Sequence, residues 1–212
     1  HAAKYAAKAD KQLIGVNVGR LGFAADVEPH EYEQLERLIT GDYATEERIL
    51  LDVEVIKEDG SKHYLAVNDA VVARGQLSKT IDLHLTLDGD EISKYRADGL
   101  LFATPTGSTA YSLSAGGPIL APKMECILMT PVCPHSLFSR SVLFSGESEL
   151  SVHVKIPEEC CCVLTIDGEK NVSVLATDRV VIRKSDLKLK LALLHNRNFY
   201  KLLNEKLKER DF

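Results

Sequence analysis

Three Asp-Gly dipeptides divide the middle of the chain into short, largely apolar segments. Asp59-Gly60, Asp88-Gly89 and Asp167-Gly168 each lie between runs that have the length and composition of β-strands. Asp-Gly is a strong signal for a β-hairpin because both residues tolerate the backbone of a tight turn. We therefore expect residues 41–195 to form a β-rich, sandwich-like domain. The three turns share no flanking pattern, so they do not indicate an internal repeat.

The two ends of the chain have a different, helical pattern. We expect a helix over 2–9, a buried strand over 12–18, and a second helix over 29–39 that ends at Gly41. Residues 1–40 are thus interpreted as the C-terminal part of an α/β domain, and 196–212 as a helix that packs back on it. The expected fold class is α+β. The strands expected in the β-rich domain are 48–56, 63–67, 71–73, 81–87, 100–104, 126–130, 150–156, 161–166, 172–175, 179–182 and 188–194.

Composition excludes several classes of function. The formal net charge of the 212 residues is -5, which argues against non-specific binding of nucleic acid through Lys and Arg. The sequence has no apolar run near the roughly 20 residues that span a bilayer, and no signal-like start. The five cysteines, three of them consecutive, fit small buried residues in a reducing compartment better than disulfides or a metal site. We therefore expect a cytoplasmic protein with no membrane or nucleic-acid partner.

The segment 103–118 is the strongest indication of a ligand site. Apart from a tyrosine and a leucine, it contains only Gly, Ser, Thr, Ala and Pro. We expect a helix over 108–115, capped by Thr106 or Ser108, whose free N–H groups suit a polar or anionic ligand. Small side chains would permit close approach, hydroxyls would bind ring nitrogens or ribose, and Tyr111 would stack. The alternative is a tight helix-packing turn, which explains the glycines but not the density of hydroxyl groups.

Two other places put acidic groups near apolar strand residues. Asp98 lies just before the run that leads into the segment 103–118, although taken alone it is better explained as a turn residue. Asn68 and Asp69 interrupt an apolar pattern, and ribose hydroxyls would be suitable partners for such a pair. For these two residues an Asx turn is an equally good explanation.

Two further sequence patterns are not assigned a catalytic or binding role. The glycines of 15–22 do not fit G-x-G-x-x-G, and no acidic residue follows a second strand, so a Rossmann dinucleotide loop is rejected. His135 follows a proline-rich turn and has no evident partner, so it is interpreted as structural rather than as a base.

Together these segments resemble the NAD kinase family. The matching sequences follow the family's order over most of the chain: GVNVGRLGF at 15–23, Asn68-Asp69, RADGL at 96–100, TPTGSTAYSLSAGGP at 104–118, TPVCPH at 130–135 and IDG at 166–168. The match at 104–118 is highly specific, whereas the glycine-rich and Asp-Gly matches would be weak alone.

The resemblance implies transfer of phosphate to the 2′-hydroxyl of the adenosine ribose of NAD, which gives NADP. The implied donor is ATP or polyphosphate, with a divalent metal ion such as Mg²⁺, and the implied assembly is a homodimer or homotetramer. Residues 1–40 would then belong to a nucleotide-kinase α/β domain. The family's Gly-Gly-Asp-Gly-Thr motif, whose Asp activates the hydroxyl, is not among the 212 residues. Because His1 leads directly into a helix, we expect that motif upstream and no catalytic residue in this chain.

The resemblance also implies which residues bind NAD. Asn68 and Asp69 would contact its nucleoside part, while Arg96 and Asp98 would reach it, across a subunit boundary in an oligomer. The adenine and ribose pocket would be lined by Thr109, Ala110, Tyr111, Ser112, Leu113 and Ser114. Further candidates are His1, Lys79 and Glu169, although Glu169 replaces a common Gln and its charge would be unfavourable beside phosphate. No metal ligand is assigned.

Three functions are weighed on these grounds. The first is NAD kinase. The second is a module that binds NAD or NADP but transfers nothing, and a Gly-Gly-Asp-Gly-Thr motif directly upstream would separate it from the first. The third is a lipid kinase of the diacylglycerol or sphingosine type, against which the sequence 104–118 argues.

Overall fold

The computed structural model describes residues 1–18, 25–75, 80–136, 139–156, 162–195 and 198–208. The chain divides into two compact units, His1–Arg48 with Leu187–Phe212, and Ile49–Asp186. Within the described residues, no helix combines the length and the apolar character needed to cross a membrane.

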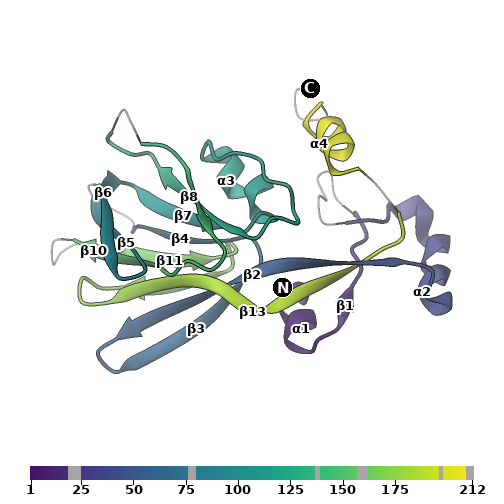
Figure 1. Cartoon of the computed structure of the whole chain (residues 1–212), viewed down its shortest axis with the longest axis horizontal. Helices are drawn as coiled ribbons and strands as arrows, with labels where there is room; N and C mark the ends of the chain where they lie inside the picture. The colour runs from purple at the N-terminus through teal and green to yellow at the C-terminus, as the bar shows by residue number, and fades with distance from the viewer. Residues whose placement is uncertain (19–24, 76–79, 137–138, 157–161, 196–197, 209–212) are drawn as a thin grey trace. The chain divides into compact units, whose positions relative to one another are not determined.

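The larger unit consists of two sheets built mainly from antiparallel pairs (Figure 1). Strands β3-β2-β13-β10-β5-β6 follow one another in the first sheet, and β12-β11-β4-β7-β8-β9 in the second. The first sheet contains β2 (Ala44–Lys57), β3 (Gly60–Ala66), β5 (Ile81–Leu87), β6 (Asp90–Ala97), β10 (Leu150–Lys155) and β13 (Arg179–Leu193). The second contains β4 (Asp69–Arg74), β7 (Gly99–Ala103), β8 (Cys126–Val132), β9 (Val142–Ser145), β11 (Cys162–Ile166) and β12 (Lys170–Val174).

Alternation along the strands places the core between the two sheets. In β5, Ile81, Leu83 and Leu85 are buried, whereas the intervening Asp82 and His84 are not, as the two-residue period of a strand requires. These residues share one apolar cluster with Phe102 and other side chains of the second sheet. The larger unit is therefore a β-sandwich.

The smaller unit combines helices with a short parallel strand pair. It contains α1 (Ala2–Lys8), β1 (Gln12–Leu13), the 3₁₀ helix η1 (Pro29–Glu36), α2 (Arg37–Thr40) and α4 (Phe199–Lys208). Strand β1 pairs in parallel with Lys190 and Leu191 of β13. The buried Asp26 carboxylate accepts hydrogen bonds from the N–H groups of Leu194 at 2.5 Å and His195 at 3.0 Å, which ties the two segments of this unit together.

The mixed fold class and the two-sheet architecture confirm the expectation from sequence, and several elements correct it. The strand expected over 12–18 is limited to Gln12–Leu13, with a separate bridge between Val16 and Val27. The helix expected over 29–39 is a 3₁₀ helix followed by one short α-helical turn. The two strands expected over 179–182 and 188–194 are one continuous strand, β13. Strands β6 and β9 were not expected, because exposed side chains predominate in both.

Candidate functional site

The segment 103–118 does not form the single helix expected from its sequence. It contains the 3₁₀ turn η2 (Gly107–Thr109) and the four-residue helix α3 (Tyr111–Ser114), separated by Ala110, whose φ of -95° and ψ of -128° are not helical. Neither piece has a side-chain cap, so the expected capped N-terminus for an anionic ligand is wrong. The physical reason lies in Ser108, whose hydroxyl donates to Pro105 O at 2.6 Å and accepts from Leu120 N at 3.0 Å.

Several hydroxyl groups of this segment and of the adjacent strand β8 form hydrogen bonds with other groups of the protein. Thr104 Oγ1 donates to Val67 O at 2.7 Å and accepts from Gly107 N at 3.0 Å. The buried Ser112 hydroxyl lies 3.2 Å from that of Thr130 in β8. The sequence pattern predicts that the many hydroxyl groups of this segment bind a ligand. Internal hydrogen bonds account for part of them instead.

The pair Asn68 and Asp69 lies at the start of β4, where three consecutive N–H groups converge on one carboxylate. Asp167 accepts hydrogen bonds from Val67 N at 3.0 Å, Asn68 N at 2.7 Å and Asp69 N at 3.1 Å. Asp69 is buried and Asn68 is half-buried. The backbone that presents the two side chains is thus held by a residue that is 98 or more positions away in sequence.

Close backbone packing brings the segment after β7 against this pair. A Cβ atom on Gly107 would lie 2.0 Å from Asn68 O, so only glycine permits the observed contact. Beyond it, Thr109 is buried and Ala110 half-buried, whereas Tyr111 and Ser114 are exposed. Helix α3 also contacts β7 (Figure 1). We call Asn68, Asp69 and residues 109–114 the shelf: Asn68 and Asp69 lie at one end of β7, and Gly107, which packs on Asn68, leads into 109–114.

Arg96 and Asp98 lie toward the opposite end of β7. On β4, Asp69 pairs with Ala103 at one end of β7, and Ala73 pairs with Gly99 at the other end. Asp69 and Ala73 are four residues apart, so the two ends are separated by about 13 Å. Asp98 lies next to Gly99 and forms an ion pair with Arg74 at 2.8 Å. Within one copy of the larger unit, the structure does not bring these two predicted NAD-binding residues to the shelf.

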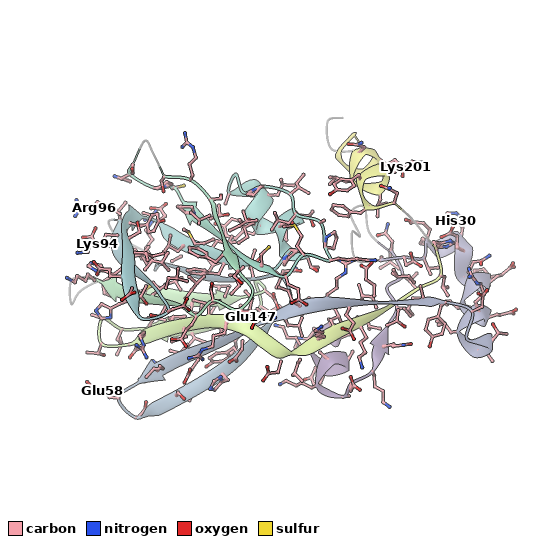
Figure 2. All side chains as sticks on the ribbon, viewed as in Figure 1. His30, Glu58, Lys94, Arg96, Glu147 and Lys201 are labelled. Carbon is pink, nitrogen blue, oxygen red and sulfur yellow. The ribbon has the colours of Figure 1, made fainter. Side chains whose placement is uncertain are left out.

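Arg96 is engaged with a carboxylate on the outer face of its sheet. Its guanidinium contacts Asp82 at 2.9 and 3.1 Å, and Figure 2 shows Arg96 and Lys94 at the surface of β6. The hydrogen bond from Arg96 lowers the pKa of the Asp82 carboxyl and raises that of Arg96 itself. Both groups therefore remain charged at neutral pH, and the positive charge of Arg96 is already paired.

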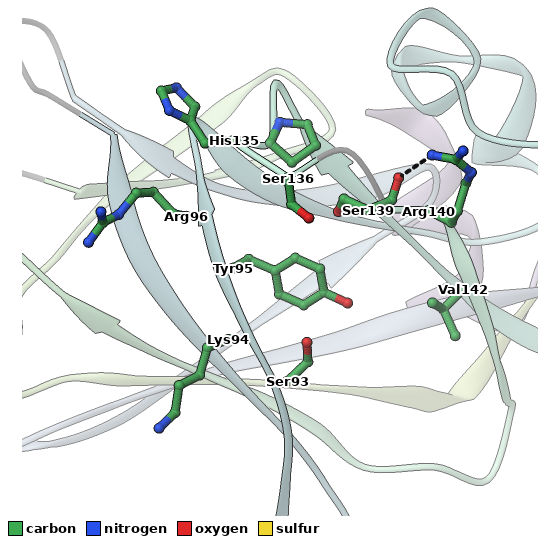
Figure 3. Close-up of a pocket in the computed structure, with 10 residues that line it drawn as sticks. Ser93, Lys94, Tyr95, Arg96, His135, Ser136, Ser139, Arg140 and Val142 are labelled. Carbon is green, nitrogen blue, oxygen red and sulfur yellow. Dashed lines mark hydrogen bonds between the residues drawn. The ribbon is translucent and has the colours of Figure 1, made fainter.

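A pocket of about 420 Å³ lies on the other side of the same strand. Figure 3 shows the Tyr95 ring among Ser93, Ser136 and Ser139, while Lys94 and Arg96 point away from it. Ser139 Oγ is buried and lacks a hydrogen-bond partner among the described residues. The pocket is lined by Ser93, Lys94, Tyr95, Arg96, Pro134, His135, Ser136, Ser139, Arg140 and Val142. Hydroxyl groups therefore surround the Tyr95 ring, and Arg140 lies at the edge of the pocket beside Ser139.

The remaining candidates are scattered. Glu169 is exposed in the turn between β11 and β12, where its N–H donates to Ile166 O at 3.0 Å. His1 belongs to the other unit, and its ring centroid lies 5.5 Å from that of Tyr5. Lys79 lies outside the described residues. Sequence reasoning assigned no site role to Asp167 or Thr104, because an Asp-Gly turn and a strand-end threonine are each explained by local structure alone.

The described part of the chain offers no protein metal centre. No group of three or more His, Cys, Asp or Glu side chains is placed there so that it could hold a metal ion. Without a metal centre among the described residues, the shelf offers four kinds of group for binding a ligand: the aromatic face of Tyr111, small side chains, the Asn68 amide and the Asp69 carboxylate.

Comparison with known proteins identifies a single family. Residues 67–194 match the family described as the ATP-NAD kinase C-terminal domain. The chain is 39% identical over 208 residues to the NAD kinase of Natranaerobius thermophilus, a match that covers 97% of this chain and 72% of that protein. It is 41% identical over 208 residues to the NAD kinase of Cellvibrio japonicus, with 97% and 69% covered.

Solved structures give the same result. The yeast NADH kinase complexed with NADH superposes with a TM-score of 0.86 and 29% sequence identity, over 93% of this chain and 59% of that one. The NAD kinase from Archaeoglobus fulgidus in complex with ATP gives a TM-score of 0.76 and 27% identity, over 93% of this chain and 74% of that one.

Proposed function

Because this chain belongs to the ATP-NAD kinase family, we propose that its residues bind NAD for phosphorylation of the adenosine ribose 2′-hydroxyl, which gives NADP. The observation that carries the proposal is the shelf. An exposed Tyr111 offers a face for the adenine, and Ala110 and Ser114 leave room beside it. The Asn68 amide and the Asp69 carboxylate are suitable partners for ribose hydroxyls.

The phosphate donor that we propose is ATP, with polyphosphate as the alternative. Phosphoryl transfer requires mainly positioning and neutralisation of charge, which agrees with the lack of a nucleophile–base pair among the predicted site residues. A divalent metal ion such as Mg²⁺ would supply charge neutralisation at the phosphates. Because the described residues do not gather a metal-binding group, we assign it no ligands and route no step through it.

We further propose that the protein acts as a homodimer or homotetramer in the cytoplasm. Arg96 and Asp98 lie far from the shelf of their own chain, and this separation supports the oligomer. In an oligomer, Arg96 and Asp98 of one copy could reach the shelf of another copy. We keep His1 and Glu169 as further candidates for NAD binding, together with Lys79, which lies outside the described residues.

Calorimetric titration with NAD tests the shelf. We expect Asp69→Ala and Tyr111→Ala each to weaken NAD binding at least tenfold, since one removes a ribose acceptor and the other a stacking face. Leu143→Ala is a matched control because this exposed side chain lies on β9 and is not among the proposed ligand contacts. Unchanged NAD affinity in both shelf variants would contradict the assignment.

A second candidate function is a NAD- or NADP-binding module that transfers no phosphate. It is favoured by one observation, the lack of a Gly-Gly-Asp-Gly-Thr sequence in the 212 residues. An assay for NADP formation separates the two candidates, whereas NAD binding is common to both.

A further inference from the structure

We infer that Asp167 is a positioning residue: its carboxylate, presented by the β11–β12 turn, fixes the backbone that aims Asn68 and Asp69 at the ligand. The inference rests on the proposed function, since it concerns how the NAD-binding shelf is held. Asp167 itself is assigned no contact with NAD.

Hydrogen-bond geometry carries the first step. Asp167 Oδ1 accepts from Asn68 N at 2.7 Å and from Asp69 N at 3.1 Å, and Oδ2 accepts from Val67 N at 3.0 Å. A carboxylate has two oxygens with about four lone-pair sites, so it can accept three N–H groups at once. The side chains of neutral residues cannot do this with the same geometry.

The carbonyl groups of the same three residues complete the arrangement. Val67 O accepts from Thr104 Oγ1 at 2.7 Å, and Asn68 O accepts from Thr104 N at 2.9 Å. Asp69 O accepts from Asp167 N at 2.9 Å. All six backbone polar groups of residues 67–69 are therefore satisfied by two residues, Asp167 and Thr104, so these two residues fix the backbone from which the Asn68 and Asp69 side chains project.

The conformation of the turn explains why this position is an aspartate. Asp167 has a φ of 49°, in the left-handed region that Asp and Asn tolerate better than other non-glycine residues. The register of β11 against β4, with Ile166 opposite Ala70, places Asp167 beside Asp69. The turn thus brings a carboxylate directly over the N–H groups of the neighbouring strand.

The test uses the 212-residue chain with the variants Asp167→Ala and Asp167→Asn. The matched control is Asp88→Ala, since Asp88 has a φ of 51° in another Asp-Gly hairpin and its carboxylate accepts Glu149 N at 2.9 Å. Asp167→Asn keeps the turn and one acceptor oxygen but turns an N–H donor toward the N–H groups. It is also the fallback variant if Asp167→Ala does not fold.

Two readouts are measured for each variant, hydrogen exchange of the amides of residues 67–69 and NAD affinity by calorimetry. We expect Asp167→Ala to speed exchange of these amides at least tenfold, while Val71 and Val72 in the middle of β4 keep their protection. We also expect it to weaken NAD binding by about 10- to 100-fold, by analogy with the loss of a hydrogen bond that orients a metal ligand. Asp167→Asn should be intermediate. Asp88→Ala should lose stability and leave NAD affinity within twofold.

The outcomes distinguish the inference from the function on which it rests. Unchanged exchange at 67–69, or faster exchange with unchanged NAD affinity, overturns the positioning role and leaves the proposed function standing. A wild-type chain that does not bind NAD overturns the proposed function, and the positioning role with it. Weaker NAD binding in Asp88→Ala that matches Asp167→Ala shows that the effect is general loss of stability, which also overturns the positioning role.

Discussion

Gly107 shows how closely the shelf depends on a single residue. A Cβ atom at this position would lie 2.0 Å from Asn68 O and 2.5 Å from Asn68 C, and both are backbone atoms that cannot rotate away. Gly117 is also closely packed, but against the side-chain hydroxyls of Ser112 and Thr130, which would lie 2.4 and 2.8 Å from its Cβ. Gly107 and Gly117 are thus needed for close packing. The backbone of Asn68 connects the packing of Gly107 to a proposed ligand contact.

Gly107→Ala should therefore displace residues 67–69. We expect a loss of about 1–3 kcal/mol in the free energy of unfolding, the usual cost of overpacking, and at least a tenfold loss of NAD affinity. Gly60→Ala is the control, because Gly60 has a φ of 128° in the β2–β3 hairpin and its Cβ would meet no atom. It should cost stability through backbone strain without changing NAD affinity. Equal NAD affinity for Gly107→Ala and wild type would contradict the packing argument. Urea denaturation and calorimetry supply the two values.

At the scale of the elements, the sequence predicts strands with a buried face better than elements whose boundaries depend on distant contacts. The period-two alternation of β5 and the apolar run of β7 identify both strands. Strand β6 is mostly polar, and its pairing with β5 cannot be inferred from its own pattern. The segment 108–115 has the composition of a helix start but is broken at Ala110, because Ser108 forms hydrogen bonds with Pro105 and Leu120 instead of capping a helix.

In the candidate site too, the sequence identifies residues with a local pattern but not residues whose role depends on distant contacts. The residues predicted to bind the ligand come from a family pattern in sequence, and the structure packs Gly107, which leads into 109–114, against Asn68. The supporting residues of the site were not recognised, because the role of Asp167 depends on hydrogen bonds to residues 98 to 100 positions away. A local pattern cannot show such a contact.

Strand β7 lies between β4 and β8 in the second sheet, and its residue Phe102 tests the assignment of the core. The side chain is fully buried between the sheets, so Phe102→Ala should cost about 3–5 kcal/mol in the free energy of unfolding. Leu143→Ala on the exposed part of β9 should change it by about 1 kcal/mol or less. Thermal and urea unfolding of both variants give the comparison, and similar losses for the two would contradict the assignment of the core.

For the whole molecule, the two units have different parts in the proposed function. All predicted NAD-binding residues that the structure describes belong to the unit Ile49–Asp186, with the exception of His1. That unit contains the proposed binding groups but no residue that we assign to activation of the ribose hydroxyl.

The 212-residue chain should therefore bind NAD without forming NADP. With NAD, ATP and Mg²⁺ we expect NADP formation no faster than in a reaction without protein, measured with a coupled dehydrogenase assay. A full-length relative with a Gly-Gly-Asp-Gly-Thr motif serves as the positive control. Clear turnover by this chain would show that a residue within it activates the hydroxyl, and would favour the first candidate function over the second.

The most direct measurement is a crystal structure of this chain grown with NAD. The account predicts density for the adenosine half on the shelf, with the adenine against Tyr111 and the ribose hydroxyls within hydrogen-bond distance of Asn68 and Asp69. Nucleotide bound elsewhere, with that surface empty, would contradict it.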